Sequence, residues 1–181
     1  MLHLVIGGAR SGKSRFAEQI VNEISFTPSP EVLYVATATA GDDEMKQRIK
    51  HHQQSRPAHW QLIEEPLDLS QIITKHNKKN QVLLIECMTL YLSNWLCCGE
   101  IAQWSLQKAA FLEAIENSQA TIVIVSNEVG SGIVPMGELN RQFVDEAGWL
   151  NQALASLAES VSLVVAGCAI NLKSQNKFKD S

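Results

Sequence analysis

The sequence predicts an α/β fold, in which a mostly parallel sheet is covered by helices on both faces. Short apolar runs typical of buried strands alternate along the chain with longer segments that have a helical spacing of apolar residues. This alternation favours parallel pairing, because each helix carries the chain back to the same end of the sheet. A length of 181 residues with 45% hydrophobic content suits one domain over 1–181, with a frayed polar tail at 173–181.

A glycine-rich segment follows the first apolar run. It fits the pattern G-x-x-x-x-G-K-[ST] and consists of Gly7, Gly8, Ala9, Arg10, Ser11, Gly12, Lys13 and Ser14. The helix predicted after it has Phe16, Ile20 and Ile24 on one face. Such a loop binds phosphates with its backbone N–H groups, so Lys13 is expected at the β- and γ-phosphates and Ser14 at Mg²⁺. The predicted fold is therefore P-loop NTPase-like, and the expected ligand is a nucleoside triphosphate.

The other elements follow from local patterns. Apolar runs predict strands at 2–6, 31–36, 60–64, 81–85, 121–125 and 161–166. Helical spacing predicts helices after the glycine loop and at 42–55, 67–75, 88–96, 104–117 and 138–160. The helix at 42–55 begins with two acidic residues, which suit a helix start, and it ends before Pro57. We expect 97–103 to be a loop.

Polar residues follow several strands at the point where each strand ends. Thr37 follows 31–36, Glu86 follows 81–85, and Asn127 with Glu128 follows 121–125. The carboxyl ends of parallel strands meet at one edge of the sheet, where ligands bind. Beside a P-loop, Glu86 is expected to hold Mg²⁺ directly or through water; the alternative is a carboxylate that caps the next helix.

Two further segments are ambiguous from spacing alone. Met45, Ile49 and His52 lie at i, i+4 and i+7 and share one helix face, while His51 falls on the flank. A histidine on such a face is more often a satisfied core residue than a catalyst. The glycine-containing segment 127–135 is either a shaped functional loop or an ordinary connection.

Charge and composition disfavour several classes of protein. A net charge of −4 and a pI of about 5.7 argue against a nucleic-acid groove, which needs a basic surface. No apolar run approaches the roughly 20 residues of a membrane span, and the amino terminus has no signal-peptide pattern.

The four cysteines form no C-x-x-C pair, so reduced thiols in a cytoplasmic protein are expected rather than zinc or disulfides. The four tryptophans are expected in the core or at an interface.

Taken together, these motifs resemble a known enzyme family. The chain is similar, from Leu4 to about Leu172, to the bifunctional adenosylcobinamide kinase / adenosylcobinamide-phosphate guanylyltransferases of cobalamin biosynthesis. The segments that carry the resemblance are the glycine loop, Tyr34-Val35-Ala36-Thr37-Ala38, Asp43-Glu44-Met45 with Arg48-Ile49 and His52, Arg56-Pro57, Trp60, Glu64-Glu65-Pro66, Glu86-Cys87-Met88-Thr89-Leu90 with Ser93-Asn94, and Asn127-Glu128-Val129-Gly130 with Gly132-Ile133-Val134-Pro135. Many kinases share the loop, whereas the histidine segment and the Asn-Glu-Val-Gly segment together are specific.

The resemblance implies two reactions and a set of residues. The family phosphorylates adenosylcobinamide with ATP or GTP, and then transfers GMP from GTP to that phosphate through a histidine–GMP intermediate. The family pattern places the nucleophile on His52, and the neighbouring His51 stays open as an alternative. Mg²⁺ held by Ser14 and Glu86 and a homotrimeric assembly are also implied. The implied nucleotide contacts are the glycine loop with Lys13, then Ala36, Thr37, Ala38, Gln53, Gln54, Ser55, Arg56, Glu64 and Glu86.

Two other functions remain open at this stage. A single-function P-loop kinase for another small metabolite would form no covalent nucleotide intermediate. A non-enzymatic nucleotide switch would leave the motifs after the predicted strands at 31–36 and 121–125 without a role.

Overall fold

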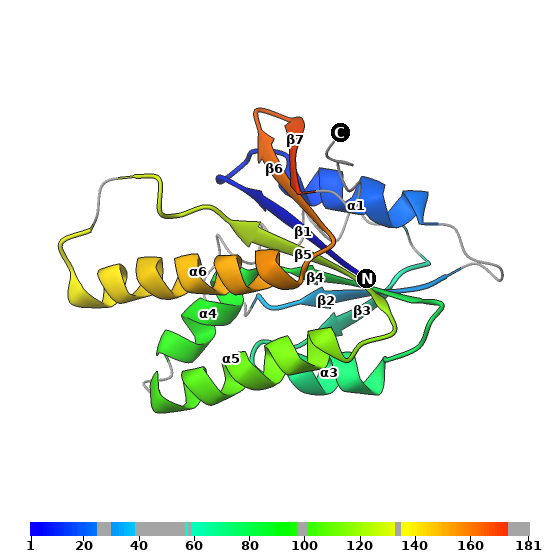
Figure 1. Ribbon diagram of the computed structural model, residues 1–181, viewed down its shortest axis with the longest axis horizontal. Helices are drawn as coiled ribbons and strands as arrows, with labels where there is room; N and C mark the ends of the chain where they lie inside the picture. The colour runs from blue at the N-terminus through cyan, green and yellow to red at the C-terminus, as the bar shows by residue number, and fades with distance from the viewer. Residues whose placement is uncertain (25–29, 39–56, 58, 98–100, 133–134, 174–181) are drawn as a thin grey trace, which may run out of the picture.

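The computed structural model describes residues 1–24, 30–38, 57, 59–97, 101–132 and 135–173. Its centre is a seven-stranded sheet (Figure 1). The strands are β1 (Leu2–Gly7), β2 (Glu31–Ala36), β3 (Gln61–Glu64), β4 (Gln81–Glu86), β5 (Thr121–Asn127), β6 (Ser160–Val165) and β7 (Cys168–Lys173). Their order across the sheet is β3-β2-β4-β5-β1-β6-β7, and the neighbouring pairs are parallel apart from the antiparallel hairpin β6–β7.

Helices cover both faces of this sheet. The described helices are α1 (Lys13–Glu23), α3 (Leu69–Lys75), α4 (Met88–Cys97), α5 (Ile101–Glu116) and α6 (Glu138–Leu157). Helix α1 packs on one face, and α3 to α6 pack on the other (Figure 1). The predicted α/β class, with a mostly parallel sheet between helical layers, is therefore confirmed.

Two apolar layers arise from the period of two in a strand. In β4, Leu83 and Ile85 belong to the layer that contains α3 to α6, whereas Val82 and Leu84 belong to the layer that contains α1. All four side chains have 0% exposure. Because both faces of the central strands are covered, these strands are continuous apolar runs rather than alternating ones.

The predicted helices differ from the observed ones in some of their boundaries and in the buried face of α1. Helix α5 begins at Ile101, so the loop predicted at 97–103 is wrong over 101–103, and α6 ends at Leu157 rather than near 160. In α1 the fully buried apolar residues are Ala17 and Val21. The predicted face of Phe16, Ile20 and Ile24 is only partly buried, at the edge of the same layer. The helix predicted at 42–55 lies outside the described residues.

The sequence pattern does not predict β7. All six side chains of this strand are exposed, so it lacks the apolar run of a buried strand. It is reached through a tight turn in which Ala166 and Gly167 have positive φ angles of 52° and 78°. Alanine rarely adopts this conformation, so the pair is not a typical hairpin signal. Lys173, expected in the frayed tail, ends β7, and 174–181 lie outside the described residues.

Three of the four tryptophans lie in the core. Trp60, Trp95 and Trp104 are buried, whereas Trp149 on α6 is 56% exposed and does not belong to the core. None of the described helices is both long enough and apolar enough to cross a membrane.

Candidate nucleotide-binding site

The glycine loop joins the end of β1 to the start of α1. Gly12, directly before the helix, has a φ angle of 96°, and Arg10 has a φ angle of 55°. These left-handed conformations turn the chain sharply, and a side chain at Gly12 would be strained. At Gly7 the requirement is space, because a Cβ atom there would lie 2.5 Å from the carbonyl oxygen of Val164 in β6.

Lys13 is the first residue of α1, and only 9% of its surface is exposed. Its Nζ donates a hydrogen bond to the carbonyl oxygen of Gly8 at 3.1 Å, which places the ammonium over the loop. Burial lowers the pKa of Lys13, while the nearby carboxylate of Glu86 acts in the opposite direction. Since burial disfavours an uncompensated charge, an anion bound beside this ammonium is favoured.

Glu86 ends β4, and both oxygens of its carboxylate accept hydrogen bonds. Ser14 Oγ donates to Oε1, and the Tyr34 hydroxyl donates to Oε2 at 2.8 Å. The strand register explains the second contact. Tyr34 pairs with Leu84 on the adjacent strand, so its side chain lies on the same face as Glu86, two residues further along.

The oxygens of Ser14 and Glu86 fit a magnesium ion. Mg²⁺ prefers oxygen ligands and is usually held by one or two carboxylates together with substrate phosphates. Here the Ser14 hydroxyl oxygen contacts the Glu86 carboxylate. Ser14 directly follows Lys13 in the loop. Within the described ranges, no group of three or more His, Cys, Asp and Glu side chains could hold a metal. Magnesium in nucleotide sites usually keeps several waters and binds substrate phosphates besides its protein ligands.

Thr37, directly after β2, connects three segments of the chain. Its hydroxyl accepts a hydrogen bond from Cys87 N and donates one to Cys87 O, both at 2.8 Å, and its own N–H donates to Glu86 O at 2.9 Å. Its carbonyl oxygen accepts a hydrogen bond from Asn94 Nδ2 at 2.9 Å, which also donates to Pro66 O at 3.1 Å. The ends of β2, β3 and β4 are thereby held together.

Asn127, the last residue of β5, and Glu128, which follows it, lie at the same edge of the sheet. Asn127 pairs with Gly7 in the sheet register, and its Nδ2 donates to Thr89 Oγ1 at 2.8 Å. The Glu128 N–H donates to Gly7 O at 3.1 Å, but its carboxylate accepts from the N–H of Gly130 at 2.7 Å. Asn127 therefore belongs to the edge that carries the loop, whereas the Glu128 carboxylate stabilises the following turn.

The structure brings together part of the predicted site. The glycine loop, Thr37 and Glu86 gather at the carboxyl ends of β1, β2 and β4. Ala36 and Ala38 flank Thr37, and Glu64 pairs with Ala36 at the end of β3 and is exposed. The other predicted residues lie outside the described ranges: His51, His52, Gln53, Gln54, Ser55 and Arg56. The nucleophile and these nucleotide contacts stay predictions.

Sequence reasoning assigns no role to Tyr34, Thr89 or Asn94, although all three lie at this edge. Each of them contacts a residue of a different element, so its role depends on which strands are neighbours. The chain order does not give this information, because β2 is the neighbour of β4 in the sheet although β3 lies between them in the chain. For Tyr34 a signal is present, since a hydroxyl inside the apolar run of β2 needs a polar partner.

Cys87 also lies at this edge, but it is a poor candidate nucleophile. Burial raises the pKa of its thiol, and a hydrogen bond with Thr89 acts in the opposite direction. Reactive thiols are partly exposed and have a lowered pKa.

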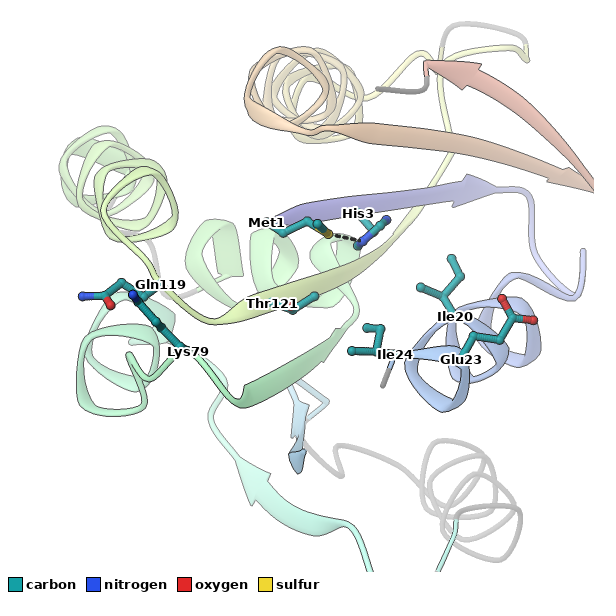
Figure 2. A pocket seen from close by; sticks show the side chains of 8 residues that line it. All are labelled: Met1, His3, Ile20, Glu23, Ile24, Lys79, Gln119 and Thr121. Atoms are coloured by element: carbon teal, nitrogen blue, oxygen red, sulfur yellow. Dashed lines mark hydrogen bonds between the residues drawn. The ribbon is translucent and has the colours of Figure 1, made fainter. Parts of the chain in front are cut away.

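A separate hollow of about 780 Å³ lies near the opposite end of the sheet (Figure 2). Its described lining residues are Met1, His3, Ile20, Glu23, Ile24, Lys79, Gln119 and Thr121. None of these belongs to the glycine loop, and they lie toward the amino ends of β1 and β5. Because ligands of parallel α/β sheets bind at the carboxyl ends, the nucleotide belongs at the glycine loop instead.

Solved structures of other proteins share this fold. A protein from Pyrococcus horikoshii superposes with a TM-score of 0.55 at 12% identity, covering 97% of this chain and 87% of that one. The flagellar accessory protein FlaH from Methanocaldococcus jannaschii matches with a TM-score of 0.51 at 13% identity, covering 96% of this chain and 78% of that one. Identities this low show the fold alone, which together with the glycine loop is P-loop NTPase-like.

Curated relatives are similar in sequence over their whole length. The bifunctional adenosylcobalamin biosynthesis protein CobP of Pseudomonas aeruginosa is 45% identical over 175 residues, covering 97% of this chain and 99% of that protein. The bifunctional adenosylcobalamin biosynthesis protein CobU of Escherichia coli is 40% identical over 186 residues, covering 96% of this chain and 100% of that protein. A family model described as cobinamide kinase / cobinamide phosphate guanyltransferase matches residues 3–172. The chain therefore belongs to the cobinamide kinase / cobinamide phosphate guanyltransferase family.

Proposed function

We propose that the protein phosphorylates adenosylcobinamide with ATP or GTP and then transfers GMP from GTP to the resulting phosphate. The product is adenosylcobinamide-GDP, an intermediate of cobalamin biosynthesis. The observation that carries the proposal is the family match over 3–172, in a chain whose Ser14 contacts Glu86 beside Lys13. The curated relatives are named as bifunctional adenosylcobalamin biosynthesis proteins, which supports both activities.

In the first reaction, a hydroxyl oxygen of the corrinoid attacks the γ-phosphorus of the triphosphate. The bond from that phosphorus to its bridging oxygen breaks, the nucleoside diphosphate leaves, and the hydroxyl proton passes to solvent. Phosphoryl transfer depends mainly on positioning and on charge stabilisation rather than on covalent chemistry by the protein. Lys13 stabilises the charge on the β- and γ-phosphates. A bound Mg²⁺, held by Ser14 and Glu86, would supply further charge stabilisation there.

In the second reaction, a neutral imidazole nitrogen of His52 attacks the α-phosphorus of GTP. A P–N bond forms, the bond to the oxygen between the α- and β-phosphorus breaks, and pyrophosphate leaves. An oxygen of adenosylcobinamide phosphate then attacks the same phosphorus, and the imidazole leaves. The glycine loop and Lys13 hold the β- and γ-phosphates in both reactions, in the second as the leaving group.

Incubation with GTP labelled at the α-phosphorus tests the second reaction. The wild-type protein should become covalently labelled, and His52→Ala should not. His51→Ala is the matched control, because it removes the adjacent imidazole and should leave the label in place. Label that persists in His52→Ala and disappears in His51→Ala would move the nucleophile to His51.

Phosphorylation of adenosylcobinamide, followed with a γ-labelled triphosphate, separates the remaining alternatives. The proposal expects His52→Ala to retain this activity and Lys13→Ala to lose it. A wild-type protein that phosphorylates the corrinoid but never acquires the α-label would be a single-function kinase. A protein that binds nucleotide and performs neither reaction would be a nucleotide switch.

Further features of the site and assembly belong to the same proposal. The nucleotide would also contact Ala36, Thr37, Ala38, Gln53, Gln54, Ser55, Arg56, Glu64 and Glu86. A cytoplasmic homotrimer is proposed on family resemblance, and the exposed Trp149 is compatible with a subunit contact. Sedimentation equilibrium of the full chain measures the assembly directly.

A further inference from the structure

We propose that Tyr34 is a positioning residue that holds the Glu86 carboxylate in the orientation needed to bind a divalent cation at the nucleotide site. The inference rests on the proposed use of a triphosphate. The Tyr34 hydroxyl donates to Oε2 of Glu86 at 2.8 Å, while Ser14 Oγ donates to Oε1. Since each carboxylate oxygen has its own donor, a rotation of the carboxylate breaks at least one hydrogen bond.

The hydroxyl of Tyr34 has no evident purpose in packing. The ring belongs to the apolar layer that contains α1, and only 3% of the residue is exposed. The neighbouring positions of β2 are aliphatic, and a phenylalanine would fill the same space. A buried hydroxyl costs free energy unless it is hydrogen-bonded, and this one donates to the Glu86 carboxylate at the sheet edge.

The arrangement assigns different tasks to the two donors. Ser14 lies in the glycine loop, so its oxygen can bind the cation together with Glu86. Tyr34 comes from β2 and contacts the other carboxylate oxygen, so its hydrogen bond can persist when the cation is bound. Loss of an outer partner of a ligating carboxylate typically lowers metal affinity about 10- to 100-fold. We expect a loss of this size for Tyr34→Phe, which removes the hydroxyl and keeps the ring.

Equilibrium binding of the α,β-methylene analogue of GTP tests this expectation, because that analogue cannot release pyrophosphate. Affinity is measured with Mn²⁺ present and again in EDTA. Tyr34→Phe should weaken binding about 10- to 100-fold with Mn²⁺ and leave the affinity in EDTA near that of the wild type. An equal loss under both conditions would show a structural role, and no loss under either would show that the hydroxyl is dispensable. Both results overturn the proposal.

Tyr91→Phe is the matched control, because Tyr34 and Tyr91 are the two tyrosines of the chain. Tyr91 lies in the other apolar layer, with its ring centroid 5.7 Å from that of Trp104 and 5.5 Å from that of Phe111. Removal of the Tyr91 hydroxyl should leave the Mn²⁺ dependence of the analogue's affinity unchanged. A Tyr91→Phe variant with the same selective loss would also overturn the proposal.

A double-mutant cycle tests whether Tyr34 acts through Glu86. In the Glu86→Gln background, Tyr34→Phe should cause little further loss of Mn²⁺-dependent affinity, because the two residues belong to one interaction. Additive losses would mean that Tyr34 acts by another route.

A second measurement requires no substitution of Tyr34, so it does not depend on whether a variant folds. In wild-type protein labelled with 3-fluorotyrosine, Mg²⁺ added to the complex with the analogue should shift the ¹⁹F resonance of Tyr34 and not that of Tyr91. Tyr91→Phe assigns the two signals, and a Tyr34 signal that does not respond would contradict the proposal. None of these readouts involves a corrinoid, so failure of the proposed enzymatic function leaves this test intact.

Discussion

At the scale of single residues, Lys13 shows how burial prepares a side chain for an anion. The residue is 9% exposed, and its ammonium donates a hydrogen bond to the backbone carbonyl of Gly8. Burial lowers the pKa of this group. A phosphate bound beside the ammonium reverses the effect, because an opposite charge nearby favours the charged form. Nucleotide binding and protonation of Lys13 should therefore be linked.

This linkage predicts how nucleotide affinity depends on pH. Below the pKa of Lys13 in the free protein the lysine is charged before and after binding, so affinity is flat. Above that pKa binding requires uptake of a proton, so affinity falls by up to about tenfold per pH unit. Because burial lowers the pKa, the decline should begin below 10.5, the value of an ordinary lysine. The measurement is the affinity for the β,γ-imido analogue of ATP between about pH 7 and pH 10.

Lys13→Arg is the control for this prediction. An arginine stays protonated throughout this pH range, so the decline should disappear even if the absolute affinity is lower. A decline of equal size in Lys13→Arg would assign the titration to another group.

At the scale of elements, the glycine loop depends on a hairpin that comes much later in the chain. The Gly167 N–H, in the turn between β6 and β7, donates to Ser11 O at 2.8 Å. A Cβ atom at Gly12 would lie 3.2 Å from the Cα atom of Gly167, and one at Gly7 would lie 2.5 Å from Val164 O. The shape of the loop is therefore set by contact with the hairpin as well as by its own glycines.

The contact between the loop and β6 predicts different effects at two adjacent glycines. Gly7→Ala places a methyl group against a backbone oxygen that cannot move without the strand, and we expect a loss of about 1–3 kcal/mol in the free energy of unfolding. At Gly8 an added Cβ atom meets nothing within 4 Å. Gly8→Ala should therefore change stability by no more than about 0.5 kcal/mol. Urea denaturation measures both, and equal losses would mean that the contact with Val164 does not constrain Gly7.

Strands and helices could be predicted from the sequence to different extents. β2 and β4 were predictable because burial on both faces makes them continuous apolar runs between polar segments. β7 was not, because its side chains are exposed and its turn uses an alanine at positive φ. The contact between Tyr34 and Glu86 requires the register of β2 against β4, which the order of elements along the chain does not supply. Glu86 itself was predictable, because any strand end beside a P-loop reaches the same edge.

At the scale of the whole molecule, one sheet serves both helical layers. β1 shows this most directly, since Leu4 belongs to the layer with α3 to α6 and its neighbour Val5 to the layer with α1. Both side chains have 0% exposure. Loss of either layer would expose one face of the same central strands, so the layers should not unfold independently. The fold class was predictable from the sequence for the same reason, because strands buried on both sides identify a covered parallel sheet.

The shared sheet predicts a single cooperative unfolding transition for the whole chain. Far-ultraviolet circular dichroism and tryptophan fluorescence should give coincident urea curves at one fixed protein concentration, which matters if subunits assemble. Leu4→Ala should shift both curves together and lower the free energy of unfolding by about 2–5 kcal/mol, since it leaves a cavity in one layer. Val5→Ala removes less side chain from the opposite layer and should again shift both curves together, by a smaller amount. If Leu4→Ala and Val5→Ala instead separated the curves into two transitions, the layers would be independent units and the single-domain description would be wrong.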